Sequence, residues 1–253
     1  MSQTLKGKVA LVTGGSRGLG AVTAAKLAEL GADVAISYAA SADKAGAVVE
    51  KLKAMGVRAM AIEADQSDLS TAKPLIETVV GEFGKLDILV NNAGIAIQGQ
   101  LVDDPELDGE KYNRQWQVNV MGTIAITRAA APKLSDGGRI IFIGSGLGSV
   151  VPFPGVADYA ATKWALAGYA KGVARDLGPR NITVNVVQPG IMPTDMAAEV
   201  AGELPDREAI LDMHPIRRIA TLEEVADIVC FLAGPSTGYV SGEAINVAGG
   251  FGI

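Results

Sequence analysis

Tyr159 and Lys163 are the two residues whose types and spacing could together move a proton. They stand four positions apart at the start of a predicted helix, so both side chains lie on one face, one turn apart. The ordinary pKa of a tyrosine phenol is about 10, and a nearby cation lowers it by stabilising the phenolate. The pair could therefore donate a proton to a carbonyl oxygen. A half-buried tyrosine beside a solvated lysine gives the same spacing by chance, so this interpretation depends on neighbouring motifs.

Polar residues at the predicted strand ends support it. Ser145 follows the apolar run at 139–144, at the carboxyl end of a strand, where open parallel sheets bind their ligands. Its hydroxyl could hydrogen-bond a substrate oxygen, and the run Asn91–Gly94 ends another strand at the same edge. Asn119 lies in the middle of a predicted helix, where asparagine is a poor helix former. A local backbone bond or an exposed polar face would explain it simply.

A glycine-rich turn, Thr13–Gly20, connects the first predicted strand to the first helix. Its glycines at 14, 18 and 20 let the backbone approach a pyrophosphate, and the helix N-terminus supplies N–H donors. It is not a P-loop, because no Gly-Lys-Ser/Thr follows, and its spacing differs from GxGxxG. A turn of this kind could be merely structural, but its place between strand and helix predicts nucleotide binding.

The end of the second predicted strand favours NADP(H) over NAD(H). NAD-selective sites usually carry an acid there for the ribose 2′-hydroxyl, and the stretch Ser37–Ser41 contains none. Arg17 in the glycine turn could reach a 2′-phosphate, with a hydrogen bond from Ser41 and a longer-range charge from Lys44. NAD(H) remains the alternative if these basic residues are ordinary surface charges.

The composition argues against several other classes of protein. With 253 residues, of which 20% are charged and 49% hydrophobic, the chain is long enough for one large α/β domain. Its net charge of −6 lacks the basic character of a nucleic-acid-binding protein. It has no apolar run of the roughly 18 residues that span a bilayer, and Val9–Val12 is too short for a signal-peptide core. We therefore expect a cytoplasmic protein with neither nucleic acid nor membrane as partner.

Two residue types that occur once narrow the chemistry further. Cys230 is the single cysteine, which excludes an internal disulfide and a thiolate zinc cluster. His214 is the single histidine, which excludes a His-pair metal site, and no GxSxG motif accompanies it as a hydrolase would need. We expect no metal site and interpret His214 as a surface or loop-packing residue.

Apolar runs without alternation, separated by amphipathic segments, predict buried parallel strands joined by helices. The fold class predicted is α/β: one Rossmann-type, doubly wound domain over residues 1–253, with about seven mostly parallel strands and helices on both faces. The stretch Ile191–Pro215 reads as a lid or a helical insert and as the variable substrate segment. The expected strands are Lys8–Thr13, Asp33–Ser37, Val57–Glu63, Leu86–Asn91, Arg139–Gly144, Ile182–Val187 and Ala244–Val247. The expected helices are Gly18–Leu30, Asp43–Met55, Leu69–Phe83, Glu110–Ala131, Tyr159–Leu177 and Leu222–Leu232.

The motifs, taken in order, resemble those of the short-chain dehydrogenase/reductase family over essentially the whole chain. They are Thr13–Gly20, Asn91–Gly94, Ser145, Tyr159–Lys163, Pro189-Gly190 with Thr194, and the tail Tyr239–Gly242 and Ala248–Gly250. The chain is most similar to the 3-oxoacyl carrier-protein reductases and related carbonyl reductases. It also resembles the naphthol-type reductases at Tyr38–Ser41 and in the gap between Ser145 and Tyr159.

This resemblance implies catalytic roles for Asn119, Ser145, Tyr159 and Lys163. Tyr159 would be the general acid in reduction, Lys163 would lower its pKa and hold the nicotinamide ribose, and Ser145 would orient the carbonyl. Asn119 would kink its helix and support a water relay. The resemblance also implies cofactor contacts, with Asp65 at the adenine, Asn92 and Gly94 at the adenosine ribose, and Thr194 and Met192 at the nicotinamide. The full set expected at the cofactor is Gly14, Ser16, Arg17, Gly18, Leu19, Gly20, Tyr38, Ser41, Asp65, Gln66, Asn92, Ala93, Gly94, Tyr159, Lys163, Pro189, Gly190, Met192 and Thr194.

The function expected is NADPH-dependent reduction of a small ketone, reversible as an alcohol dehydrogenase. An apolar pocket would surround the carbonyl, formed by Leu147, Val151, Phe153, Met192 and Met196. A 3-oxoacyl-(acyl-carrier-protein) reductase is the first alternative, and would need a basic patch from Arg114, Arg128, Arg175 and Arg180. A non-catalytic nucleotide-sensing regulator on the same fold is the second. The resemblance also implies a homotetramer, with the helices at 110–131 and 159–177 as candidate interfaces.

Overall fold

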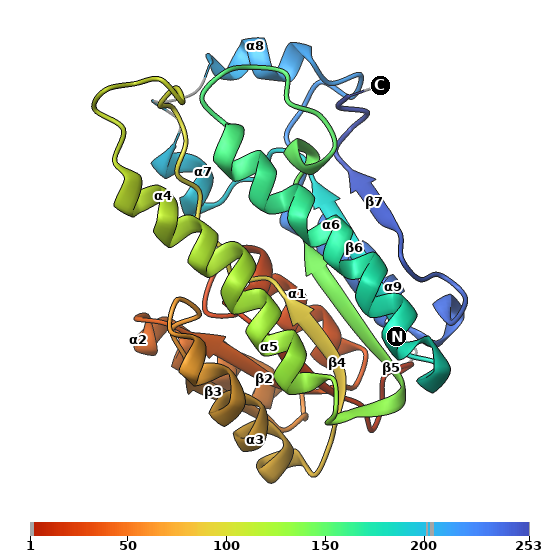
Figure 1. Ribbon diagram of the computed structural model, residues 1–253. Coiled ribbons are helices and arrows are strands. Elements are labelled where there is room, and N and C mark those ends of the chain that lie inside the picture. The colour runs from red at the N-terminus through yellow and green to blue at the C-terminus, as the bar shows by residue number, and fades with distance from the viewer. Residues whose placement is uncertain (1–2, 201, 203–204, 253) are drawn as a thin grey trace.

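Seven parallel strands form one sheet whose strand order reverses once. The computed structural model describes residues 3–200, 202 and 205–252. The strand order is β3-β2-β1-β4-β5-β6-β7, and every neighbouring pair is parallel (Figure 1). The strands are β1 Val9–Val12, β2 Asp33–Tyr38, β3 Ala59–Glu63, β4 Leu86–Asn91, β5 Leu134–Ile143, β6 Thr183–Pro189 and β7 Ala244–Val247. The predicted doubly wound α/β sheet is confirmed.

The reversal lies between β1 and β4. Strand β1 pairs with β2 on one side and with β4 on the other, so β1–β3 extend the sheet in one direction and β4–β7 in the other. Open parallel sheets bind ligands outside the carboxyl ends of their strands at such a point, because the outgoing loops diverge there and leave a crevice. The loops after β1, β4 and β5 therefore form the expected site.

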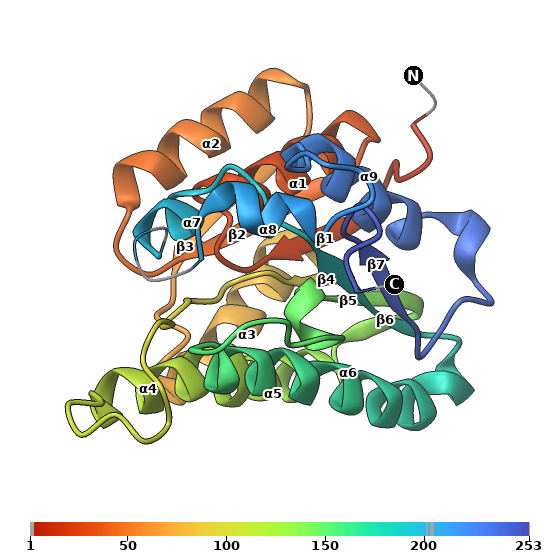
Figure 2. The same cartoon turned by 90° about the horizontal axis from the view of Figure 1, so that it is seen from above.

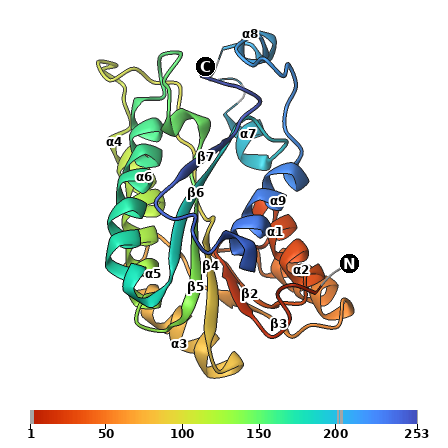
Figure 3. The ribbon, with the colours of Figure 1, turned by 90° about the vertical axis from the view of Figure 1, so that its right-hand side faces the viewer.

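Helices cover both faces of the sheet. Figures 2 and 3 show α1, α2 and α9 on one face and α3, α5 and α6 on the other. The helices are α1 Gly18–Glu29, α2 Ala42–Ala54, α3 Ala72–Phe83, α4 Gly109–Trp116, α5 Thr123–Ala130, α6 Ala157–Leu177, α7 Asp195–Glu199, α8 Arg207–Asp212 and α9 Leu222–Ala233. Short 3-10 turns are found at Leu69–Thr71, Gly146–Gly148, Gly178–Arg180 and Pro235–Thr237. None of the helices described here has the length and hydropathy needed to cross a membrane.

The strands are apolar on both faces because each face packs against helices. In β1, Ala10 and Val12 belong to the core under α1, α2 and α9, whereas Val9 and Leu11 belong to the core under α3, α5 and α6. All four β1 residues are buried. Continuous apolar runs, rather than alternating ones, are what a strand buried on both sides requires.

Local signals fix where several helices begin and end. Helix α9 starts with a capping box, in which the Glu224 N–H donates to Thr221 Oγ1 at 3.2 Å and the Thr221 N–H donates to Glu224 Oε2 at 2.9 Å. Helix α3 ends at Gly84, whose φ of 82° lies in the left-handed region that favours glycine. Both signals, the Thr and Glu three residues apart and the glycine after the helix, are visible in the sequence.

The main differences from the sequence predictions are a divided helix and a longer strand β5. The helix predicted over Glu110–Ala131 is α4 and α5 joined by a π-helical segment, Gln117–Gly122. Strand β5 begins at Leu134, because Leu134 pairs with Leu86 before the main ladder starts at Arg139. The segment 191–215 contains α7 and α8, so the helical-insert interpretation is the better one. Within it residues 201, 203 and 204 lie outside the described residues, as do residues 1, 2 and 253 of the predicted domain.

Candidate active site

The glycine turn after β1 packs tightly against the loop after β4. Gly14 has a φ of 64°, and a Cβ placed on it would lie 2.9 Å from Ala93 Cα. A Cβ on Gly20 would lie 2.4 Å from the Gly14 carbonyl oxygen. Neither position can take a larger residue without a shift of the backbone. The backbone of the turn thus packs closely against the start of α1. This close packing leaves the N–H groups at the helix N-terminus accessible to a pyrophosphate.

Hydrogen bonds lock these two loops together. The N–H groups of Asn92 and Ala93 both donate to Thr13 Oγ1 at 3.0 Å. The Asn92 side chain donates to the carbonyl oxygens of Thr13 at 2.8 Å and Gly14 at 3.2 Å. The Asn92 side chain therefore supports the turn, and the contact with the adenosine ribose that the resemblance implies stays a prediction.

The remaining residues predicted at the cofactor surround this turn, with different roles for their side chains. Ser16 is half-buried, whereas Leu19 packs into the core and leaves its backbone as the part that can reach a ligand. Tyr38 ends β2, and Ser41 is the N-cap residue of α2 but makes no side-chain capping bond. Gly18 has a φ of 53° and open space around it except for a Thr194 methyl group at 3.8 Å.

Two residues after β3 brace the same edge. Asp65 accepts a hydrogen bond from the Ser67 N–H at 2.9 Å and pairs with Arg114 at 3.5 Å, and together they hold the pKa of its carboxyl below the usual value. Gln66 is buried and donates to the carbonyl oxygen of Val118 at 2.7 Å, which ties this loop to the π-helical segment. The Gln66 side chain thus supports the structure of this edge, and its contact with the cofactor stays a prediction.

The basic residues expected at a 2′-phosphate meet an acidic residue of α7. Arg17 pairs with Asp195 at 3.2 Å, and Lys44 approaches the same carboxylate at 3.8 Å. More than half of each of the three side chains is exposed, so each ion pair is weak. The three residues show that the turn after β1, the start of α2 and the start of α7 meet at one position.

Tyr159 and Lys163 are buried near the start of α6, with 8% and 5% of their surface exposed. The Lys163 Nζ donates to the carbonyl oxygen of Ile143 at 3.1 Å and lies 5.6 Å from the centre of the Tyr159 ring. Ser145 Oγ accepts a hydrogen bond from the Leu147 N–H at 3.2 Å, and the Ser145 side chain also hydrogen-bonds Tyr159. The structure brings the three residues together as predicted from their spacing and strand position.

Burial controls the protonation of this pair. It raises the pKa of Tyr159 to about 12, against a smaller lowering by a hydrogen bond with the Ser145 side chain. It lowers the pKa of Lys163 to about 8. Desolvation accounts for the upward shift in the protein alone, and the lowering of the Tyr159 pKa by Lys163 that the resemblance implies stays a prediction.

Asn119 is 1% exposed and lies within the π-helical segment. Its Oδ1 accepts from the Ile95 N–H and its Nδ2 donates to the Ile95 carbonyl oxygen, both at 2.9 Å. The same Nδ2 donates to Thr162 Oγ1 at 3.2 Å. The simple explanation by a local bond or an exposed face is wrong, because Asn119 joins the loop after β4 to α6. The helix geometry changes where Asn119 lies, while the water relay stays a prediction.

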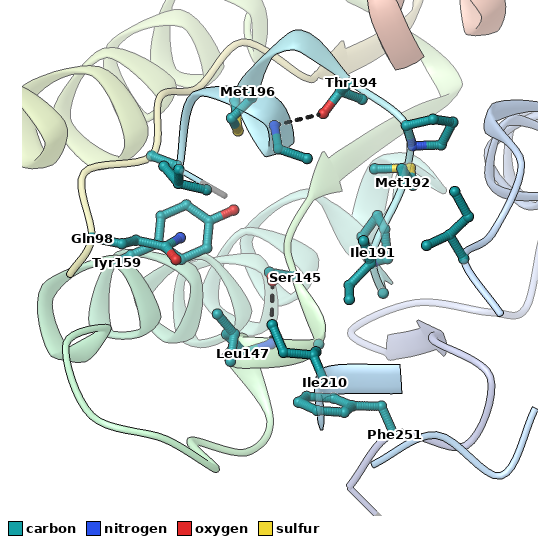
Figure 4. A pocket seen from close by; sticks show the side chains of 18 of the residues that line it. Gln98, Ser145, Leu147, Tyr159, Ile191, Met192, Thr194, Met196, Ile210 and Phe251 are labelled. Carbon is teal, nitrogen blue, oxygen red and sulfur yellow. Dashed lines mark hydrogen bonds between the residues drawn. The ribbon is translucent and has the colours of Figure 1, made fainter. Parts of the chain in front are cut away.

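A cavity of about 430 Å³ opens beside Tyr159 and Ser145, a size typical of small-molecule sites (Figure 4). The Tyr159 hydroxyl points into it in the figure. Pro189, Gly190, Met192 and Thr194 line it, and Thr194 also caps α7 by accepting from the Ala197 N–H at 3.1 Å.

The apolar wall of this cavity was predicted in part. Leu147, Phe153, Met192 and Met196 line it, whereas Val151 is 51% exposed and is not among its described lining residues. Ile191, Val200, Pro205 and Ile210 also line it and belong to the segment predicted to be the variable substrate segment, whereas the sequence did not indicate Ala96, Gln98, Ile219 and Phe251. They come from separate loops, and no local pattern connects them.

His214 also lines the cavity. It is buried, stacks on Phe251 with ring centres 4.9 Å apart, and places Nδ1 2.8 Å from the Ile210 carbonyl oxygen. The loop-packing interpretation of His214 is confirmed, and the surface interpretation is wrong. Within the described part of the chain, no group of three or more His, Cys, Asp and Glu side chains is placed to hold a metal ion.

Comparison with known proteins places this geometry in context. A family model described as enoyl-(acyl carrier protein) reductase matches residues 14–252. The 3-oxoacyl-(acyl-carrier-protein) reductase of Staphylococcus aureus is 41% identical over 245 residues, which cover 96% of this chain and 97% of that protein. Versicolorin reductase 1 of Aspergillus parasiticus is 40% identical over 256 residues, covering 97% of each.

The chain is also similar to proteins of known structure. A short-chain dehydrogenase of Burkholderia cenocepacia, crystallised in complex with NADP, is 44% identical with a TM-score of 0.92. The match covers 99% of this chain and 100% of that one. The similarity therefore extends over the glycine turn, the buried tyrosine and lysine, and the cavity beside them.

Proposed function

The chain belongs to the short-chain dehydrogenase/reductase family, and we propose that it reduces a small ketone with NADPH, as a single NAD(P)-binding catalytic domain. Enzymes of this family act on carbonyl and hydroxyl groups. The observation that carries the proposal is the position of Tyr159, buried at the wall of an apolar cavity with Ser145 and Lys163 beside it. That arrangement suits a carbonyl that must gain a proton away from water.

The residues of the chain have separable roles in this reaction. Bound nicotinamide supplies the hydride. Tyr159, whose pKa of about 12 keeps it protonated at neutral pH, holds the proton that the carbonyl oxygen receives. Ser145 donates its O–H to the same oxygen and so orients the carbonyl. Lys163, with a pKa of about 8, exchanges protons readily near neutral pH and can restore the proton of Tyr159.

The cofactor is NADP(H), and the chain fits it at two places. Gly14 and Gly20 keep the turn after β1 free of side chains, beside the N-terminus of the 12-residue helix α1. Arg17 and Lys44 converge on Asp195 beyond the end of β2, and the strand end itself, residues 37–41, has no acid to bind a ribose 2′-hydroxyl. The similar protein of Burkholderia cenocepacia was crystallised with NADP, which supports the same choice.

Reduction of a carrier-bound 3-oxoacyl group is the second candidate, favoured by the similarity to the Staphylococcus aureus reductase. Two of the four arginines considered for carrier docking already have acidic partners. Arg114 pairs with Asp65 at 3.5 Å, and Arg180 pairs with Asp136 at 2.8 Å. This weakens the case for a basic docking patch and favours a free small ketone. A non-catalytic regulator is disfavoured, because the complete catalytic set is buried beside the cavity.

The test is the oxidation of NADPH and of NADH with a panel of ketones, diketones and 3-oxoacyl thioesters, followed by nicotinamide absorbance. Turnover with NADPH that disappears in Tyr159→Phe is the expected result. Faster turnover with NADH contradicts the cofactor assignment, and turnover that survives in Tyr159→Phe contradicts the proton donor. A strong preference for the carrier-bound thioester would make the second candidate correct.

We also propose a homotetramer in the cytoplasm. Trp164 on α6, Phe231 on α9 and Tyr239 are large hydrophobic side chains with more than half of their surface exposed, which is unusual for a free surface. The free, buried Cys230 and the lack of a second cysteine suit a reducing compartment. Light scattering after size-exclusion chromatography measures the assembly, and a monomeric mass would contradict it.

A further inference from the structure

Among the described residues that line the cavity, one polar side chain has no task in the proposed reaction and no partner in the described chain. Among the described lining residues, the polar side chains are Gln98, Ser145, Tyr159, Thr194 and His214. Ser145 and Tyr159 act on the carbonyl, Thr194 caps α7, and His214 is bonded to the Ile210 carbonyl oxygen. Gln98 has no such role.

Gln98 is buried and makes no side-chain hydrogen bond to the part of the chain that the structure describes. It is 6% exposed, and its Oε1 is buried with no partner among the described residues. Burying an amide oxygen without a hydrogen bond is unfavourable, so such groups are rare in proteins and call for an explanation. Figure 4 shows Gln98 on the Tyr159 side of the cavity, across from Ile191 and Phe251.

The backbone around Gln98 is fixed on both sides. The Ile97 N–H donates to the side chain of Gln115, and the Ile95 N–H and carbonyl oxygen are bonded to Asn119. The Gly99 N–H donates to the carbonyl oxygen of Gly155 at 2.8 Å. A binding group held by its surroundings loses little freedom when a ligand arrives, which is the condition for selective recognition.

We propose that Gln98 is a specificity-determining residue that binds a hydroxyl group on the ketone substrate, so that the preferred substrates are hydroxyketones. The inference rests on the proposed function and names its substrate class. The Gln98 amide offers an oxygen that accepts and an N–H group that donates, and a hydroxyl group can bind either atom because it is itself both donor and acceptor. A neutral hydroxyl fits better than a charged group, because no described lining residue carries a carboxylate, an ammonium or a guanidinium group.

The experiment compares ketones that differ by one group. Acetoin is paired with 3-methylbutan-2-one, and 4-hydroxybutan-2-one with pentan-2-one, so that in each pair a methyl group replaces the hydroxyl. The ratio of kcat/KM within a pair is measured in the wild type, in Gln98→Met and in Gln100→Met. The ratio of ratios removes the intrinsic reactivity of each ketone.

Gln100→Met is the matched control. Gln100 lies on the same loop, but its Nε2 donates to the carbonyl oxygen of Glu106 at 2.9 Å and it does not line the cavity. We expect Gln98→Met to reduce the preference for the hydroxyketone about ten-fold in at least one pair, because a neutral hydrogen bond is lost. Gln100→Met should leave the preference as it is in the wild type.

The outcomes separate this inference from the proposed function. Equal ratios in the wild type and Gln98→Met, with turnover intact, overturn the role of Gln98 and leave the reductase standing. If the wild type reduces no ketone of any kind, the proposed function fails. In that case binding of each pair to the protein with NADPH, followed by NADPH fluorescence, still decides the role of Gln98, and equal affinities across the pair in both variants overturn it.

Discussion

Lys163 carries its charge in a buried position, so its removal should change how stability depends on pH. Burial lowers the Lys163 pKa from 10.5 to about 8. At pH 7 a shift of this size means that the charged lysine lowers the free energy of unfolding by about 3 kcal/mol. Lys163→Met removes the charge and keeps a side chain of similar length. It also leaves the Ile143 carbonyl oxygen without this donor, so the absolute stability at one pH is ambiguous.

The slope with pH is free of that ambiguity, and its sign follows from the direction of the shift. Below pH 8 the lysine is protonated in both the folded and the unfolded chain, and the full destabilisation is present. Between pH 8 and 10.5 the folded protein releases the proton first, so the unfolded chain binds more protons and stability rises with pH. The wild type should gain about 1 kcal/mol between pH 7 and pH 9 from this group.

The effect of Lys163 on stability is best measured below about pH 9, because two other buried groups affect stability above it. Burial raises the pKa values of Cys230 and Tyr159, each to about 12. Above the ordinary pKa of each group the unfolded chain ionises while the folded protein does not, so both groups reduce stability as pH rises further. Their contributions are common to the wild type and the lysine variant and cancel in the difference between the two.

Urea unfolding at pH 7, 8 and 9, followed by tryptophan fluorescence at one protein concentration, measures this difference. The stability of the wild type relative to Lys163→Met should rise across the series. Lys171→Met, which changes an exposed lysine on the same helix, should follow the wild type. If Lys163→Met and the wild type run parallel from pH 7 to 9, Lys163 is not held at a lowered pKa, and its proposed role in restoring the Tyr159 proton loses its basis.

Three other changes test the cofactor site and its supports. Asp195→Asn removes the carboxylate that pairs with Arg17 and Lys44. The affinity for 2′,5′-ADP, measured by calorimetry, should rise about 3-fold while the affinity for 5′-AMP stays unchanged. An equal rise for both ligands would refute an effect specific to the 2′-phosphate. Asn119→Ala leaves the Ile95 backbone unpaired and should lower the free energy of urea unfolding by about 3 kcal/mol, whereas a loss below about 1 kcal/mol would mean that the loop is held by other contacts. Gly20→Ala crowds the glycine turn and should weaken NADPH binding, seen by fluorescence, at least about ten-fold. The control is Gly46→Ala, at a position where an added Cβ meets only open space, and this variant should bind NADPH as the wild type does.

Much of the fold and the catalytic set could be predicted from the sequence because the signals are local. Continuous apolar runs marked the parallel strands, and the glycine turn marked the crossing from β1 to α1. The four-residue spacing placed Tyr159 and Lys163 on one face of α6, and the strand end placed Ser145 at the same edge of the sheet. These features depend on chain geometry over a few residues, which the order of amino acids determines directly.

Other features arise where distant segments meet, and only the tertiary structure decided them. The upward shift of the Tyr159 pKa results from burial by α6, the cavity wall and the loop after β5, which no spacing encodes. Asn119 looked like a misplaced helical residue until its bonds to Ile95 became visible. The place of Gln98 in the cavity depends on loops that come together only when the sheet is complete. Spacing along the chain thus determined which groups could react, while desolvation and contacts between loops decided how those groups are protonated and what they can bind.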